Sequence, residues 1–577
     1  EMNFAAIDQG IDALRKVEVP ASWKDAQDEV LPPKEVPEFV EKIQTPMARQ
    51  EGDELPVSAF VGMEDGTFPV GTTAYEKRGI AVMLPEWQID KCIQCGQCSF
   101  VCPHATIRQF LLEQEEIAKA PETFVTKQAL GRGLQDYGYR IQVSPLDCTG
   151  CGNCADICPA PEKALVMRPA EEILDREADN WEFAMTIKEK SDLLDWKTLK
   201  GSQLRTPLFE FHGACPGCGE TPYLRLISQL FGDRMIIANA TGCSSIYTAS
   251  APSMAYTTNR EGRGPAWANS LFEDNAEFGY GMWLGMGQLR KRIANVMEQL
   301  LRGSIDEELA NALRQWLDAF NDGEKSLAAS KAVREALEKY KDSTDPLIQE
   351  LISSQDYLVK PSQWIIGGDG WAYDIGYGGL DHVLATGADV NILVMDTEVY
   401  SNTGGQSSKS TPTAAVAKFA ASGKRIRKKD LGRMAMSYGY VYVAQIAMGA
   451  NLNHTLRTLI EAEAYPGPSL IIAYSPCINH GIRTGMGTSI MQEKKAVEAG
   501  YWHLYRYNPQ RKLEGKNPFT LDSKDPSGSF QEFLTSEVRY SSLRNTFPDI
   551  AEELFTQAEQ DAKERLEEYK RLAALDY

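Results

Sequence analysis

The chain has 577 residues, with 60 Lys and Arg against 80 Asp and Glu, and a formal net charge of −20. Its length predicts roughly two to four domains, and its hydrophobic content of 43% can fill well-buried cores. So acidic a chain argues against a nucleic acid partner, which requires a broad basic face.

The cysteine content points to a reducing compartment. The most apolar stretches are only strand-length, so we expect neither a secretory signal nor a membrane span. Without an export signal, the 12 cysteines are expected in the cytoplasm, where thiols stay free for metals instead of forming disulfides. They fall into three groups of four.

Residues 1–50 are polar and punctuated by prolines. This composition predicts the tail of a preceding domain followed by a linker. The chain starts at Glu1 with Met2 behind it, so we expect a piece of a longer protein.

Residues 51–195 carry two cysteine runs of identical spacing, C-x2-C-x2-C-x3-C followed by proline. The repeat marks a duplicated unit, and the spacing predicts an α+β ferredoxin-like domain with two 4Fe–4S clusters. In two-cluster ferredoxins the fourth cysteine of each run ligates the other cluster. Zinc sites favour separated CxxC pairs and fit these runs poorly. The expected ligand sets are Cys92, Cys95, Cys98 and Cys158, and Cys148, Cys151, Cys154 and Cys102.

Within residues 51–195, a partly helical insertion is expected at 113–134. Residues 196–577 have a different sequence pattern. Short buried-strand runs alternate with helical patterns, and this alternation predicts an open, mainly parallel α/β sheet. A charged helical insertion is expected at 286–341 and an amphipathic helix at 548–572. The expected strands are residues 234–238, 363–366, 390–395, 440–445 and 469–474.

Two other features are expected to be structural rather than catalytic. The basic block at residues 424–429 predicts a solvated face near a helix start, with a docking patch for an acidic carrier protein as the alternative. His212 and His480 lie close in sequence to cysteines, and both are expected to be structural histidines with satisfied hydrogen bonds.

The four remaining cysteines are dispersed along the α/β part. Cys215 and Cys218 lie in Cys-Pro-Gly-Cys-Gly-Glu, while Cys243 and Cys477 each follow an expected strand. Open α/β sheets bind ligands at the carboxyl ends of their strands. We therefore predict that these four cysteines hold a third 4Fe–4S cluster at an α/β active site. A zinc site and unrelated buried cysteines are the alternatives.

A Gly-Asp-Gly turn follows the expected strand at 363–366. Magnesium takes oxygen ligands in near-octahedral geometry and often bridges protein to phosphate. Asp369 can supply a carboxylate oxygen, and after one further helix and strand Thr397 can supply a hydroxyl and Val399 a carbonyl. The glycines allow backbone N–H groups to approach a diphosphate. The pattern predicts thiamine diphosphate bound through Mg²⁺, with an ordinary strand-to-helix turn as the alternative.

The two sites together predict one reaction. Thiamine diphosphate acts as an electron sink when a 2-oxoacid is decarboxylated. A neighbouring cluster can take the electrons one at a time, and the paired clusters can carry them outward.

These motifs resemble the carboxy-terminal half of pyruvate:ferredoxin (flavodoxin) oxidoreductases of the single-chain type. The resemblance implies decarboxylation of pyruvate with coenzyme A to acetyl-coenzyme A and CO₂, electrons passed to ferredoxin or flavodoxin, and a homodimer. It covers essentially the whole chain. It rests on both cysteine runs, Cys-Pro-Gly-Cys-Gly-Glu, Thr-Gly-Cys-Ser-Ser, Gly-Asp-Gly-Trp, Thr-Glu-Val-Tyr-Ser-Asn-Thr-Gly-Gly-Gln and Ser-Pro-Cys-Ile-Asn-His-Gly.

The resemblance also implies roles for individual residues. Asp369, Thr397 and Val399 ligate magnesium, and Asn402 also faces the substrate as a catalytic residue. The dispersed cysteines Cys215, Cys218, Cys243 and Cys477 hold the cluster nearest the cofactor. The implied contacts with thiamine diphosphate are Glu220, Cys243, Gly368, Asp369, Gly370, Trp371, Thr397, Glu398, Val399, Tyr400, Ser401 and Asn402.

The family's amino-terminal half is absent from this sequence. By the resemblance, that half supplies the glutamate that activates the cofactor, the groups that hold the pyruvate carboxylate and much of the coenzyme A site. The chain alone is therefore expected to be catalytically incomplete. Two alternatives stay open: the same chemistry on another 2-oxoacid, or a non-catalytic iron–sulfur electron-transfer subunit.

Overall fold

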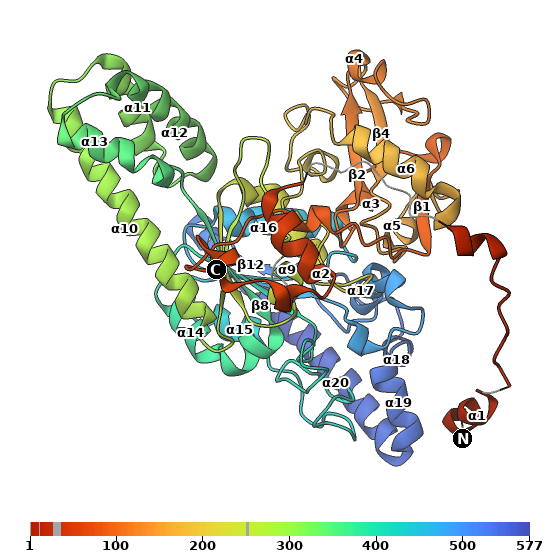
Figure 1. Cartoon of the computed structure of the whole chain (residues 1–577). Coiled ribbons are helices and arrows are strands. Elements are labelled where there is room, and N and C mark those ends of the chain that lie inside the picture. The colour runs from red at the N-terminus through yellow and green to blue at the C-terminus, as the bar shows by residue number, and fades with distance from the viewer. Residues whose placement is uncertain (1, 11, 27–35, 250–252, 577) are drawn as a thin grey trace. The chain divides into compact units, whose positions relative to one another are not determined.

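The computed structural model describes residues 2–10, 12–26, 36–249 and 253–576 (Figure 1). The chain forms two compact units, Glu1–Pro56 and Val57–Tyr577. Part of the predicted linker, residues 27–35, lies outside the described ranges. Within those ranges the first unit contains only short helices: α1 (Met2–Gln9), η1 (Ala21–Asp25), η2 (Val40–Gln44), α2 (Thr45–Ala48) and η3 (Gly52–Glu54).

The second unit is built around an eight-stranded sheet of order β13-β12-β10-β11-β9-β8-β6-β7. Strands β6 to β11 pair in parallel, and β12 and β13 add an antiparallel edge next to β10. The predicted α/β class is therefore confirmed. The strands are β6 (Met235–Ala240), β7 (Ala266–Ser270), β8 (Ser362–Gly368), β9 (Asn391–Asp396), β10 (Tyr442–Ile446), β11 (Ser469–Tyr474), β12 (Tyr505–Tyr507) and β13 (Phe519–Leu521).

Both faces of this sheet are covered by helices. The side chains of β9 alternate between two apolar clusters, with Ile392 and Val394 in one and Leu393 in the other. A continuous apolar strand is typical of a parallel sheet buried on both sides. One face packs against α8 (Thr221–Phe231) and α16 (Leu452–Ala464). The other packs against α14 (Tyr377–Ala385), α15 (Leu431–Met436), α18 (Phe530–Thr535), α19 (Val538–Thr546) and α20 (Pro548–Ala573).

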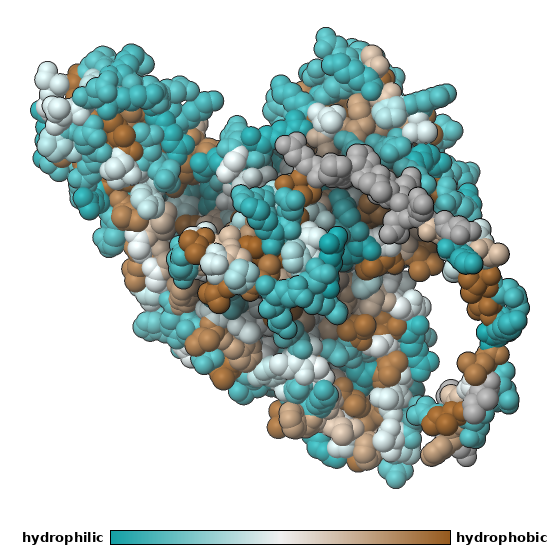
Figure 2. Space-filling view, in the orientation of Figure 1, coloured by the Kyte–Doolittle hydropathy of each residue, from teal (hydrophilic) through white to brown (hydrophobic). Residues whose placement is uncertain are grey.

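The helical insertion expected at 286–341 is present and extends further at both ends. Helix α10 (Asn275–Arg302) runs from the sheet into a small bundle that has its own apolar core around the fully buried Trp316. The outer surface of this bundle is mainly hydrophilic (Figure 2). The other bundle helices are α11 (Glu307–Asp318), α12 (Gly323–Leu337) and α13 (Pro346–Ser353).

The segment with the two cysteine runs forms small antiparallel sheets. Strands β2 (Ile107–Leu112), β4 (Gly138–Val143) and β3 (Lys127–Gln128) form one, and β1 (Met83–Trp87) pairs with β5 (Leu165–Pro169). Each run enters a short helix, α3 (Gln97–Phe100) or α5 (Asn153–Asp156), directly after a left-handed glycine. Helix α6 (Ala170–Ala184) follows β5, and the expected helical part of 113–134 is α4 (Gln114–Ile117).

The helix expected at 548–572 is confirmed as α20, which begins with Pro548 in its first turn, where its missing N–H has no intrahelical partner to lose. Its buried stripe includes Ala551, Leu554, Phe555 and Ala558. Of the helices described, even the long α10 and α20 are too polar to cross a bilayer.

Candidate functional site

The predicted cofactor residues gather at one edge of the parallel sheet. The carboxyl ends of parallel strands share an edge, and open α/β sheets bind ligands there. Asp369 follows β8, Thr397 follows β9, Cys477 follows β11, and Cys243 begins α9 (Cys243–Thr248) shortly after β6.

Three oxygens at this edge fit the ligand shell of magnesium. The Thr397 hydroxyl lies 3.0 Å from Asp369 Oδ1 and 2.9 Å from the Val399 carbonyl oxygen. Neighbouring ligands of an octahedral ion with bonds of about 2.0–2.1 Å lie roughly 2.9 Å apart. Both measured distances from the Thr397 hydroxyl therefore match the spacing of neighbouring magnesium ligands.

Asp369 is a carboxylate whose charge is only partly compensated, because the Lys428 charge lowers its pKa less than burial raises it. It is fully buried, and burial followed by the neighbouring Asp396 carboxylate raises its pKa well above the usual range. Hydrogen bonds from Thr397 and from the Ser408 hydroxyl oppose this shift. A bound dication is the strongest local charge in such a site and would keep Asp369 ionised.

The glycines of the turn have separate reasons to be glycine. A Cβ on Gly370 would lie 2.6 Å from the ring of Tyr400, whereas a Cβ on Gly368 would meet nothing closer than 3.9 Å. Gly370 is therefore required for Tyr400 to cover the turn. The open space beside Gly368 leaves its backbone accessible to a ligand.

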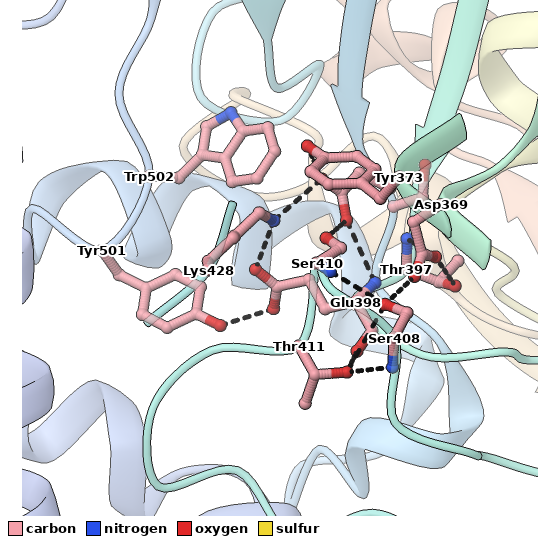
Figure 3. A network of polar contacts seen from close by, with 12 residues as sticks. Asp369, Tyr373, Thr397, Glu398, Ser408, Ser410, Thr411, Lys428, Tyr501 and Trp502 are labelled. Carbon is pink, nitrogen blue, oxygen red and sulfur yellow. Dashed lines mark hydrogen bonds and ion pairs between the residues drawn. The ribbon is translucent and has the colours of Figure 1, made fainter. Parts of the chain in front are cut away.

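A buried charge network holds the loop that follows β9 (Figure 3). Lys428 Nζ lies 2.8 Å from Asp396 Oδ2 and 2.9 Å from Glu398 Oε1. Arg539 Nη2 lies 2.8 Å from the other Glu398 oxygen, Oε2, which also accepts a hydrogen bond from the Tyr501 hydroxyl. Burial raises the pKa of Glu398, but the Lys428 and Arg539 charges outweigh it and lower that pKa to about 2.

This network was not found from the sequence. Lys428 belongs to the basic block for which a solvated face or a docking patch was expected, yet its side chain is only 7% exposed. The expectation is wrong for Lys428, because the two buried carboxylates draw its ammonium inward. Glu398 and Trp371 were expected to contact the cofactor. The Glu398 side chain is occupied by its ion pairs, and Trp371 packs in the apolar core, so any contact falls to their backbones.

The dispersed cysteines converge on one cavity of about 200 Å³. Among the described residues, no three His, Cys, Asp or Glu side chains are gathered tightly enough to bind a single metal ion. A mononuclear zinc site needs sulfurs within about 2.3 Å of one point, whereas a cluster needs them around a cage. The cavity is lined by Cys215, Cys218, Cys243 and Cys477, together with Glu220, Tyr247, Thr397, Ser401 and Asn402.

Polar groups meet the sulfurs of this cavity. The Ser401 hydroxyl donates to Cys243 Sγ at 3.3 Å, and Asn402 Oδ1 lies 3.9 Å from the same sulfur. Glu220 is buried, which raises its pKa to about 7, and it accepts a hydrogen bond from the Tyr247 hydroxyl at 3.0 Å. Ser401 and Asn402 therefore bring the loop that follows β9 to the cysteine cavity.

Close backbone packing brings Cys215 and Cys218 to Cys477. A Cβ on Gly219 would lie 2.5 Å from the Pro476 nitrogen, and Gly219 N–H donates to the Pro476 carbonyl at 3.1 Å. Only glycine allows these two cysteine loops to touch. This contact joins a loop before α8 to the loop after β11.

The cysteines of the two runs also lie in crossed sets. Burial raises the pKa of the Cys98 thiol, and its own run together with Cys158 of the other run raise it further. Burial likewise raises the pKa of the Cys154 thiol, and the charges that raise it further include Cys102 of the other run. Backbone N–H groups point at the sulfurs, as thiolate ligands require: Gln94 at Cys92 (3.4 Å), Gly150 at Cys148 (3.4 Å) and Ala164 at Cys158 (3.3 Å).

Family models match three stretches of the chain. Residues 91–169 match a 4Fe-4S dicluster domain, and residues 358–473 match the C-terminal TPP binding domain of thiamine pyrophosphate enzymes. Residues 26–81 match the EKR domain of unknown function. Fold, site and family models thus define the class: a thiamine diphosphate-binding α/β domain joined to an iron–sulfur dicluster domain.

Several longer proteins are similar to the chain over nearly its whole length. The chain is 58% identical to a pyruvate-flavodoxin oxidoreductase of Klebsiella pneumoniae over 99% of its length and 49% of that protein. It is equally similar, with the same coverage, to a pyruvate:ferredoxin oxidoreductase of Moorella thermoacetica. A pyruvate dehydrogenase [NADP(+)] of Euglena gracilis is 49% identical over 99% of the chain and 32% of that protein. The chain is thus similar, over nearly its whole length, to about half of each of these pyruvate:flavodoxin and pyruvate:ferredoxin oxidoreductases.

Proposed function

We propose that the chain is the cluster-bearing half of an enzyme that decarboxylates pyruvate with coenzyme A and passes electrons to ferredoxin or flavodoxin. The observation that carries this proposal is the position of Thr397. Its hydroxyl belongs to the oxygens around Asp369, and its side chain also lines the cavity of the dispersed cysteines. A cofactor held at Asp369 is therefore a direct neighbour of a cluster held by those cysteines.

The proposed cofactor site uses Asp369, Thr397 and Val399 to hold Mg²⁺. When bound, thiamine diphosphate supplies the electron sink for decarboxylation of a 2-oxoacid. The backbone beside Gly368 is open to a diphosphate group. Asn402 lines the cavity beside Cys243 and is proposed to orient the substrate.

Three 4Fe–4S clusters are proposed, in a fixed order. Burial raises the pKa of the Cys151 thiol to about 11, and the Gly217 N–H, from the loop between Cys215 and Cys218, opposes that rise by donating to the sulfur. The cluster of Cys102 and Cys148–Cys154 therefore adjoins the dispersed set. All four cysteines of the remaining set are partly exposed. This exposure suits a cluster that passes electrons to a carrier protein.

Removal of Cys477 tests the third cluster. We expect Cys477→Ala, made in the complete protein and purified anaerobically, to lose about four of roughly twelve irons, because each cubane holds four. Thiamine diphosphate and Mg²⁺ should still bind, since Asp369, Thr397 and Val399 are unchanged. Iron analysis and calorimetric titration of the cofactor measure the two properties. Retention of all the iron would contradict the assignment of Cys477.

The complete protein is proposed to include a further half that docks on α10. Phe278, Leu284 and Leu289 of this helix are exposed apolar residues. A Cβ on Gly281, Gly285 or Gly287 would meet no atom of the chain within 4 Å. The exposed surface of α10 therefore suits close packing against another polypeptide, and the chain spans only about half the length of its first two relatives. A homodimer and a coenzyme A site outside this chain complete the proposal, which places the reaction in the cytoplasm.

The substrate is tested with the complete protein. Reduction of a low-potential acceptor should require pyruvate, coenzyme A and thiamine diphosphate together, and it should be slower with 2-oxoglutarate or a branched 2-oxoacid. A faster reaction with another 2-oxoacid would show that this 2-oxoacid, and not pyruvate, is the preferred substrate. If freshly isolated anaerobic protein contained no thiamine diphosphate and bound none, the chain would instead be an electron-transfer subunit.

A further inference from the structure

Two histidines meet between the ferredoxin-like part and the α/β part. His104 follows Cys102 by two residues, and His212 precedes Cys215 by three. Their rings are stacked, with centroids 4.4 Å apart and an interplanar angle of 26°. His104 is 2% exposed and His212 is fully buried.

The hydrogen bonds of the pair are reciprocal. His104 Nε2 donates to the Ala214 carbonyl at 3.0 Å, and His212 Nε2 donates to the Pro103 carbonyl at 2.7 Å. Each histidine therefore binds the backbone beside the other one. The bond on each side ends at a residue adjacent to a cysteine, Cys102 or Cys215.

The same contacts orient both rings. Because the partners of Nε2 are carbonyls, each Nε2 donates a proton. His212 Nδ1 accepts from the Ala214 N–H at 3.3 Å, and Thr149 Oγ1 lies 3.5 Å from His104 Nδ1. The His212 ring is therefore neutral, with its proton on Nε2.

We propose that the stacked pair His104–His212 is a positioning device that clamps the cluster loop of the α/β part against the cluster loop of the ferredoxin-like part. The inference rests on the proposed function, because both cysteine sets must hold clusters. The histidine pair sets the separation across which one electron leaves the cluster at Cys215 and reduces the cluster at Cys102.

A histidine that only fills the core does not require this arrangement. His212 already has an apolar neighbour, because its ring stacks on Phe209 at 4.7 Å, and a phenylalanine would fill that space. The hydrogen bonds serve to join two separate segments at their cysteines. Gly217 N–H, which donates to the Cys151 sulfur, provides a third link between the same two cluster loops.

The test is His212→Phe in the complete holoenzyme, purified anaerobically. Phenylalanine keeps a flat ring but removes the donor to Pro103 and the acceptor for Ala214. We expect amide hydrogen exchange to accelerate about tenfold or more at Ala214, whose part-buried N–H loses its acceptor. The same is expected at Phe211, whose N–H donates to the His104 carbonyl at 3.1 Å. We also expect a weaker and broader magnetic interaction between the two reduced clusters in EPR spectra, with unchanged iron content.

Two further variants complete the experiment. His212→Gln keeps an N–H donor for Pro103 and should give intermediate exchange rates. His382→Phe makes the same substitution at an exposed residue of α14 and should match the wild type in every readout. If His212→Phe loses iron, His104→Phe, which removes the donor to Ala214 and leaves the His212 bond to Pro103, takes its place.

The outcomes separate the inference from the function on which it rests. Wild-type exchange and EPR coupling in His212→Phe, or in His104→Phe when that variant is needed, overturn the clamp while leaving the proposed function intact. A wild-type protein without interacting clusters overturns the proposed function, and the clamp with it. Faster exchange together with weaker coupling supports the clamp.

Discussion

Replacing Asp369 with alanine is expected to abolish magnesium-dependent binding of thiamine diphosphate. Asp369 supplies the only carboxylate of the proposed ligand set. Loss of an outer partner of a metal ligand already costs about 10–100-fold in affinity, so loss of the ligand itself should cost at least about 100-fold. Isothermal titration of the complete protein with thiamine diphosphate, at fixed Mg²⁺ concentration, measures this loss.

Without cofactor, Asp369→Ala is not expected to lower the thermal stability of the protein. Because burial and Asp396 disfavour the Asp369 charge, the variant without cofactor should unfold at the same temperature as the wild type or slightly higher. Only the wild type should gain thermal stability when Mg²⁺ and thiamine diphosphate are added. Asp374→Asn is the control. Asp374 follows the same Gly-Asp-Gly turn but pairs with Lys409 and belongs to no proposed ligand set. Normal cofactor binding by Asp369→Ala would refute the magnesium assignment.

Glu398→Gln is expected to destabilise the fold by about 3 kcal/mol at neutral pH. The substitution preserves volume but leaves two buried cations, Lys428 and Arg539, without one of their counter-charges. Breaking a buried ion pair typically costs about 3–5 kcal/mol, and the remaining partners Asp396 and Glu537 place the effect at the lower end. Anaerobic thermal unfolding followed by tryptophan fluorescence measures the difference.

The destabilisation should depend on pH. The pKa of Glu398 falls from its usual 4.5 to about 2 in the folded protein, so the stabilisation is complete above about pH 4.5 and is lost as the pH falls toward 2. The gap between wild type and Glu398→Gln should therefore narrow in that window. Glu514→Gln removes an exposed pair with Lys516 and should leave unfolding unchanged. A gap that stays constant down to pH 2 would contradict the role of the charge.

Structural features could be predicted from the sequence where neighbouring residues determine them. Strand β11 begins and ends where the apolar run at 469–474 predicts, because a strand buried on both faces has a continuous apolar sequence. The cysteine runs and the Gly-Asp-Gly turn are equally local, since a few adjacent residues shape each of them. These segments supplied the α/β class and the residues that meet around Asp369.

Features that depend on distant partners were not predictable in this way. The basic block gave no sign that Lys428 turns inward, because its partners Asp396 and Glu398 come from another strand end. Strands β12 and β13 have three residues each, too few for a periodic pattern. His212 was expected to be structural, and nothing near it in the sequence indicates that His104 would stack on it.

The contact between Gly219 and Pro476 sets an order of maturation for the newly made chain. Each cysteine run can enclose most of a cluster within seven residues, so iron can be captured as soon as these segments have been synthesised. The dispersed set is a long-range site, and such contacts form late because a long loop must first close. Its last ligand, Cys477, arrives only when β11 pairs between β9 and β10. If the proposed third cluster occupies that cavity, its iron would report that the sheet is complete, and protein lacking only those four irons would be arrested before this step.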